Sequence, residues 1–177
     1  MQSIIRQPVL NEQTMRHEFV NVDISQIRLN EECVMSIDGS TTCSGVSILN
    51  KQGLIMYSIA FIRDKNDGET PVQYKVRFKR ELLNILTHNT CIKQVYYEEP
   101  YWGYAESAKI LMMLRTSVEE LIAENEPNLN YLTLTEVNNK KWKKYFLAPD
   151  SCPSNSELEK EAVREKLHLL HPELLYS

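Results

Sequence analysis

The chain has 177 residues, a length that allows one well-buried core and is too short for two ordinary domains. Apolar residues make up 42% and charged residues 25%, which is usual for a globular protein in water. The net charge of −4 argues against a general affinity for nucleic acid, although a local basic surface can still bind it.

No apolar run approaches the ~18 residues of a membrane span, and residues 1–25 have no signal-peptide core. The cysteines include no CxxC pair and have no histidine at zinc spacing, which favours reduced structural thiols over disulfides or a zinc site. Both patterns predict an intracellular protein that does not enter the membrane. The cysteines are Cys33, Cys43, Cys91 and Cys152.

The first regular pattern along the chain predicts three consecutive strands, at residues 33–38, 45–49 and 54–62. The turns between them are short, and short turns join neighbouring strands antiparallel, so we expect a three-stranded meander. Residues 1–31 have no clear period. They could form an arm or a short strand, and we favour an N-terminal extension outside the core, with the domain spanning residues 32–177.

Helices and strands alternate in the rest of the chain. Apolar spacing predicts helices at residues 72–86 and 104–125, a short basic helix at 138–146 and a last helix at 156–170. Strands are expected at residues 91–97 and 130–137. The strand at 91–97 follows a helical crossover, so it should run parallel to the first strand. The predicted fold is α/β, a five-stranded mixed sheet flanked by helices, and this order of elements resembles the ribonuclease H-like fold.

Two of the predicted strands end in a carboxylate, Asp38 after the first and Glu98 after the fourth. Parallel neighbouring strands would bring both acids to the same edge of the sheet. Carboxylate oxygens suit magnesium, so we predict a metal-dependent phosphodiesterase site there. The alternative for Asp38 is an ordinary turn acid, because Asp-Gly is common in turns. Glu99 follows Glu98 and points to the opposite face, and the sequence leaves open which of the two faces the site.

Candidate nucleic-acid contacts lie in three places. Ser40 could bond a phosphate or only stabilise its turn, and Trp102 could stack on a base or close the end of the sheet. The basic helix has four lysines around an aromatic residue; such a run is usually a solvated face, but in a nuclease it would contact phosphates. These lysines are Lys140, Lys141, Lys143 and Lys144.

The two acid-ended strands also carry a resemblance to a known family. Residues 36–41 (SIDGST), Gly45-Val46 and residues 97–100 (YEEP) ahead of a long helix resemble the RuvC family of Holliday junction resolvases, particularly its divergent phage-type members. The resemblance implies that Asp38 and Glu98 are catalytic metal ligands for Mg²⁺, with Mn²⁺ as a substitute. It also implies a homodimer that nicks four-way DNA junctions in recombination and repair, in the cytoplasm of a bacterium or of a phage-infected host.

The sequence departs from this family in its last helix. The family places one or two further acids there, usually as Asp-x-x-Asp-Ala, and here no Asp follows Asp150. Either the polypeptide is a truncated form or another acid substitutes, with Glu157 and Glu161, one helical turn apart, as weak candidates. Two carboxylates instead of four would lower both metal affinity and turnover.

Two other functions fit parts of the sequence. Asp-Gly-Ser-Thr-Thr at residues 38–42 also resembles the phosphate-binding turn of sugar kinases and actin-like ATPases, but those proteins need a second domain to close over ATP. A catalytically inactive module that binds DNA junctions is the third hypothesis, and the missing acids favour it.

Overall fold

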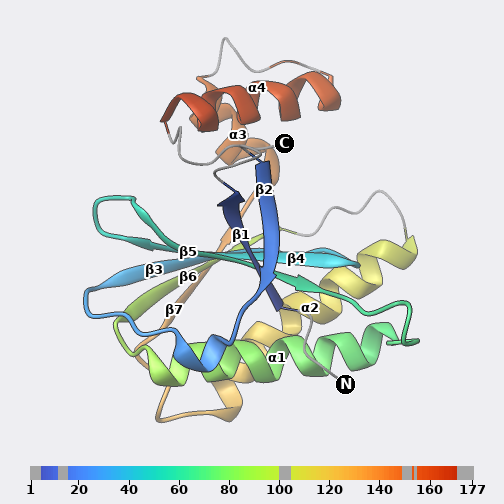
Figure 1. The fold of residues 1–177 in the computed structure, drawn as a ribbon. Helices are drawn as coiled ribbons and strands as arrows, with labels where there is room; N and C mark the ends of the chain where they lie inside the picture. The colour runs from blue at the N-terminus through green and yellow to red at the C-terminus, as the bar shows by residue number, and fades with distance from the viewer. Residues whose placement is uncertain (1–4, 12–15, 100–104, 149–152, 154, 171–177) are drawn as a thin grey trace. The chain divides into compact units, whose positions relative to one another are not determined.

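Figure 1 shows the computed structural model, which describes residues 5–11, 16–99, 105–148, 153 and 155–170. The chain divides into two compact units. The first contains residues 1–7 and 20–136, and the second contains residues 8–19 and 137–177. Within the described residues, no helix combines the length and the apolar character that crossing a membrane requires.

The strands form one mixed sheet, most of which belongs to the first unit. It has seven strands in the order β2-β1-β5-β4-β3-β6-β7, so the prediction of five strands is wrong. Their bounds are β1 Ile5–Asn11, β2 Arg16–Asn21, β3 Cys33–Asp38, β4 Cys43–Asn50, β5 Ile55–Ile62, β6 Ile92–Glu98 and β7 Thr133–Val137.

The two additional strands come from the segment that we expected to lie outside the core. Ile5 of β1 pairs with Phe61 of β5 and is buried, and Ile24 and Ile27 between β2 and β3 are buried as well. Residues 1–31 therefore add core side chains as well as strands. Their apolar residues are too few and too irregularly spaced for the sequence pattern to indicate this.

The pairing within the centre of the sheet follows the prediction. β3, β4 and β5 form an antiparallel meander, and β6 runs parallel to β3. The β3–β6 register shifts once: Cys33 pairs with Ile92 but Val34 pairs with Gln94, which leaves Lys93 as an extra residue on β6. This bulge changes which β6 side chains face each side of the sheet.

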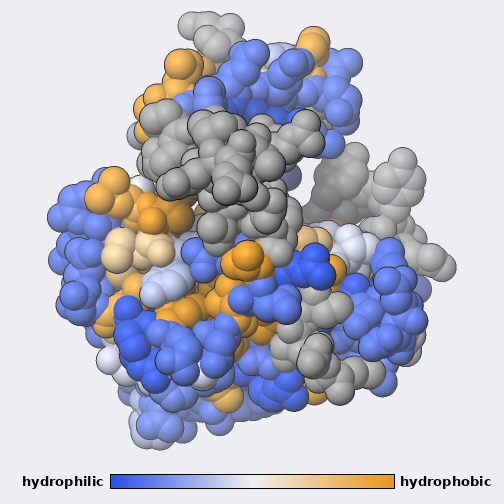
Figure 2. All heavy atoms as spheres, viewed as in Figure 1, coloured by the Kyte–Doolittle hydropathy of each residue, from blue (hydrophilic) through white to orange (hydrophobic). Residues whose placement is uncertain are grey.

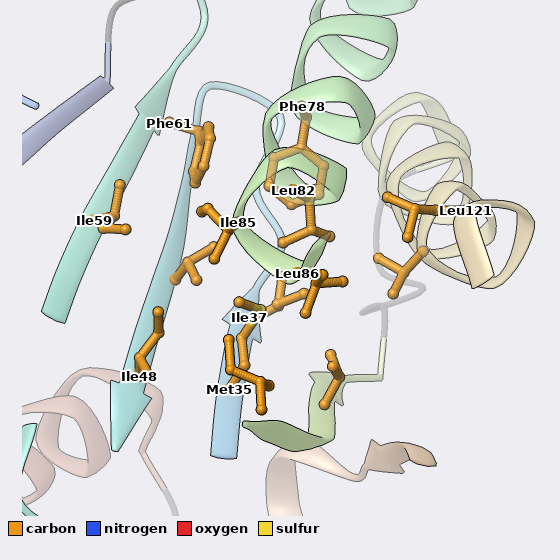
Figure 3. Packing of buried hydrophobic residues seen from close by; sticks show 14 of the residues in the cluster. Met35, Ile37, Ile48, Ile59, Phe61, Phe78, Leu82, Ile85, Leu86 and Leu121 are labelled. Carbon is orange, nitrogen blue, oxygen red and sulfur yellow. The ribbon is translucent and has the colours of Figure 1, made fainter. Parts of the chain in front are cut away.

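Two helices, α1 (Pro71–His88) and α2 (Ala105–Glu124), complete the core. Thr70 caps α1, since its side chain accepts a bond from the Gln73 backbone N–H while the Gln73 side chain bonds back to Thr70. Figure 3 shows side chains of β3, β4 and β5 pointing toward those of α1, with α2 beyond them. These side chains include Met35, Ile37, Ile48, Phe61, Phe78, Leu82, Leu86 and Leu121.

The second unit contains two helices that pack together, α3 (Asn139–Leu147) and α4 (Ser156–Leu170). Lys143 of α3 forms an ion pair of 3.0 Å with Glu159 of α4. The visible surface of α4 is mainly hydrophilic (Figure 2). The side chain of Asn155 accepts bonds from the N–H groups of Glu157 and Leu158, so it caps α4.

Candidate active site at the end of strands β3 and β6

The last paired residues of β3 and β6 set the relative positions of Asp38 and Glu98. Ile37 pairs with Tyr97 in the parallel register, and Asp38 and Glu98 are the next residue on each strand. Ile37 and Tyr97 are buried against the helices, with exposed fractions of 1% and 3%. Because side chains alternate along a strand, Asp38 and Glu98 both lie on the opposite face, where Asp38 is exposed and Glu98 half-buried.

The bulge at Lys93 determines which glutamate shares the face of Asp38. Beyond it, Val95 and Tyr97 point into the core, so Glu98 points away from the core on the same side as Asp38. Glu99 follows the end of β6. The sequence left this choice open, and the register places Glu98 beside Asp38.

The sheet surface next to Asp38 has only small side chains. Asp38 pairs with Gly45 of β4, which pairs in turn with Ala60 of β5. On the other side of the sheet, burial and then the negative charge of Asp38 raise the pKa of the neighbouring Tyr97 phenol. Burial and the same charge also raise the pKa of the Cys43 thiol. The Asp38 charge therefore raises the pKa of a buried phenol on β6 and of the thiol at the start of β4.

A buried hydroxyl network holds the turn between β3 and β4. The Ser44 hydroxyl donates to the Ser40 carbonyl oxygen at 3.2 Å and accepts from the Ser40 N–H at 3.1 Å. The Tyr74 hydroxyl of α1 accepts from the Ser44 N–H at 3.0 Å and lies 2.8 Å from both the Ser44 hydroxyl and the Phe61 carbonyl oxygen. Helix α1 thereby fixes the turn that follows Asp38.

The Ser40 hydroxyl is part of this turn. It lies 3.4 Å from the Thr42 N–H and 3.5 Å from the Cys43 N–H, both of which donate toward it. These bonds give Ser40 a structural role in the turn, the second of its two predicted roles. Contact with a phosphate stays a prediction.

A buried ion pair anchors the loop on the β5 side of the turn. Arg77 of α1 donates from Nε and Nη2 to the two carboxylate oxygens of Glu69, at 2.8 and 2.9 Å, and from Nη2 to the Ile62 carbonyl oxygen at 2.7 Å. The hydrogen bond from Arg77 lowers the pKa of Glu69. Arg63, next along the chain from Ile62, donates its N–H to the Thr42 carbonyl oxygen in the turn.

The residues at this edge include few metal donors. Across the described residues, no group of three His, Cys, Asp or Glu side chains lies close enough together to hold a metal ion. Asp38 and Glu98 together offer two carboxylates. Magnesium is commonly bound in this way, through one or two carboxylates with water and substrate phosphates completing the shell, so the donor chemistry fits that ion.

The predicted lysine contacts lie on α3 in the second unit. Lys140, Lys141 and Lys144 are exposed, whereas Lys143 is engaged with Glu159 and its side chain is only 16% exposed. Lys143 is thus held within the unit. Trp102, the predicted stacking residue, lies outside the described residues, as does Cys152, whereas Cys33, Cys43 and Cys91 are free thiols.

Four supporting residues were not predicted from the sequence: Ser44, Tyr74, Glu69 and Arg77. Arg77 is buried although its side chain is charged. One signal was present: Tyr74 and Arg77 lie three residues apart, one turn of a helix, and both face the strand ends. Their partners lie in other elements, so the pattern within the helix does not reveal them.

The architecture is a ribonuclease H-like α/β fold. Two solved structures of RuvC from Thermus thermophilus have a similar fold. RuvC in complex with a Holliday junction substrate matches with a TM-score of 0.56 and 13% sequence identity, over 81% of this chain and 96% of that chain. The second RuvC structure matches with a TM-score of 0.53 and 14% identity, over 80% and 96%.

At these identities the likeness shows the fold alone. No protein-family model matches the sequence, and no curated protein sequence matches it.

Proposed function

We propose that this protein is a metal-dependent endodeoxyribonuclease that cleaves branched DNA such as four-way junctions. The observation that carries the proposal is the register of β3 and β6, which places Asp38 and Glu98 side by side on one face of a RuvC-like sheet. One of the similar RuvC structures is in complex with a Holliday junction substrate, which supports a branched DNA as the substrate class.

In this proposal the carboxylates of Asp38 and Glu98 hold Mg²⁺, or Mn²⁺ as a substitute. An ion held there would supply Lewis-acid chemistry, making a bound water more acidic and offsetting negative charge on the phosphodiester. The hydroxyl network of Ser44 and Tyr74 holds the turn after Asp38, which limits movement of its carboxylate. Gly45 and Ala60 add little side-chain bulk to the neighbouring sheet surface, which would favour close approach of a DNA strand.

The exposed lysines of α3 are the proposed phosphate contacts. Lys140, Lys141 and Lys144 share the solvent side of a helix that has no acidic residue. Lys140 and Lys141 lie in the first turn, where positive charge opposes the helix dipole, so these two lysines do not serve the stability of α3; Lys144 lies in the last turn. A phosphate backbone would offset their charge. Because a four-way junction has two strands to cut symmetrically, we also propose that the active form is a homodimer.

The decisive experiment is cleavage of a labelled four-way junction with and without Mg²⁺. We expect nicking that requires the metal and is abolished by Asp38→Asn or by Glu98→Gln, with circular dichroism showing intact folding. Glu99→Gln is the matched control and should retain cleavage, because Glu99 follows the end of the strand. Unchanged cleavage by Asp38→Asn or Glu98→Gln would refute the site.

A second candidate function is junction binding without cleavage. It is favoured by the donor set, since the described residues provide two adjacent carboxylates and no group of three. Binding of the junction in Mg²⁺ with no nicked product, in wild-type protein and in Asp38→Asn alike, would support this function over the nuclease.

A further inference from the structure

The inference concerns the side chain of Tyr97, which no step of the proposed reaction uses. Tyr97 is almost completely buried, and its hydroxyl has no hydrogen-bond partner among the described residues. The hydroxyl oxygen lies so close to the position that a Cβ atom on Gly39 would occupy that the two atoms would overlap. The phenol therefore packs directly on the Gly39 backbone, in a space that exists only because residue 39 is glycine.

This contact joins the two strands immediately beneath the proposed metal ligands. Tyr97 precedes Glu98 on β6, and Gly39 follows Asp38 at the end of β3. Tyr97 pairs with Ile37, so its ring extends along the inner face past Asp38 to the first residue of the turn. The phenol thus connects the backbone positions next to both carboxylates on the side of the sheet away from them.

Stability alone does not explain a hydroxyl at this position. A buried hydroxyl without a partner costs about 1–3 kcal/mol relative to one that is satisfied. Phenylalanine would fill the same core space without that cost. Unsatisfied groups retained in a native structure are often associated with function.

We infer that Tyr97 is a positioning residue for Asp38. Its hydroxyl supports the Gly39 backbone from below and so holds the Asp38 carboxylate at a constant distance from Glu98. This inference rests on the proposed function. Metal-binding side chains must be held within about 0.5 Å of the productive geometry, and glycine by itself leaves the chain after β3 free to shift.

The test combines Mg²⁺ binding with stability. In Tyr97→Phe, the free energy of unfolding should equal or exceed that of the wild type, because the variant removes a buried hydroxyl that has no partner among the described residues. The Mg²⁺ concentration for half-maximal nicking should rise severalfold, with a matching loss of affinity in a calorimetric Mg²⁺ titration. Tyr131→Phe, which changes a phenol elsewhere in the first unit, should alter neither Mg²⁺ measurement.

The steric contact has its own test. Gly39→Ala should lower the melting temperature, because its Cβ would overlap the Tyr97 hydroxyl. Adding Tyr97→Phe should restore part of that loss, since the next ring atom lies 3.0 Å from the Cβ position. No restoration would show that the phenol does not hold residue 39, and the inference would fail.

The outcomes separate the inference from the proposed function. Wild-type protein that neither binds Mg²⁺ nor nicks the junction overturns both. Wild-type protein that does both, with Tyr97→Phe identical to it in Mg²⁺ dependence, overturns the positioning role alone. A loss of Mg²⁺ affinity that is matched by an equal loss of stability also overturns it, because it would show a structural role only.

Discussion

The two faces of the central strands differ in almost every side chain, although neighbouring residues supply them. On the inner face, Met35 and Ile37 of β3 are buried against α1 and α2. On the outer face, Ser36 and Asp38 alternate with them and are exposed. Ser36 pairs with Ser47, and Ser47 pairs with Ser58, so small polar residues continue across three strands.

This difference shows that one strand can contribute to stability through the residues on its inner face and to chemistry through the alternating residues on its outer face. The inner face must be filled at crystal-like density, so any loss of volume is costly. The outer face has smaller and more polar side chains, of which Ser36 and Asp38 are exposed. Changes on the inner face should therefore lower stability, and changes on the outer face should affect binding or catalysis while the fold persists.

The largest effect on stability is expected at Glu69, a charged residue that is buried in its ion pair with Arg77. Glu69→Gln removes the carboxylate that Arg77 contacts through two nitrogens, and breaking such a buried pair typically costs about 3–5 kcal/mol. Urea unfolding monitored by circular dichroism measures the change. A loss below about 1 kcal/mol would show that the pair contributes little beyond its hydrogen bonds.

The Glu69→Gln variant also tests how the free energy of unfolding depends on pH. The folded state lowers the pKa of Glu69, so the ionised carboxylate adds stability above its unfolded pKa of about 4.3, and this stability is lost as the pH falls below that value. Wild-type stability should therefore fall more steeply than that of Glu69→Gln between about pH 5 and pH 3. Parallel curves would contradict the assignment.

The next effect compares two adjacent residues of β3 directly. Ile37→Ala removes buried volume and should cost about 2–5 kcal/mol, whereas Ser36→Ala on the outer face should change stability by no more than about 0.5 kcal/mol. Chemical denaturation of each variant measures its loss of free energy of unfolding. Similar losses for the two would mean that the outer face is packed in solution and that the comparison fails.

The smallest effect on stability is expected on α3. Replacing Lys140, Lys141 and Lys144 by glutamine should leave folding unchanged but weaken junction binding. The plot of log affinity against log salt should become shallower by roughly 0.9 for each phosphate that the protein no longer neutralises. Lys143→Gln on the same helix is the control, because Lys143 already pairs with Glu159 and should keep the wild-type slope. If the triple variant keeps the wild-type slope of log affinity against log salt, α3 does not contact the DNA.

Much of the fold could be predicted because its signals are local. The three-stranded meander, the helices and the parallel crossover follow from apolar spacing and turn length, and the structure confirms the mixed α/β fold. The seven-stranded sheet could not be predicted, because β1 joins β5 through backbone pairing, as at Ile5 and Phe61, without a strong pattern of its own.

The candidate site was predictable only in part for the same reason. Asp38 and Glu98 were visible as acids at strand ends. The residues that support them act over long separations in the chain: Ser44 bonds Tyr74 thirty residues later, and Tyr97 contacts Gly39 on another strand. No periodicity within one element encodes such contacts.

The bulge at Lys93 has a consequence for how such a site could change over evolution. Two halves of β6 alternate out of phase, and a single inserted residue produces the offset. Deleting Lys93 would restore regular alternation along β6 and would leave Glu98 on the face of Asp38, because Gln94 already pairs with Val34. Related chains that differ in length by one residue at this point could therefore keep the same glutamate beside the aspartate of β3.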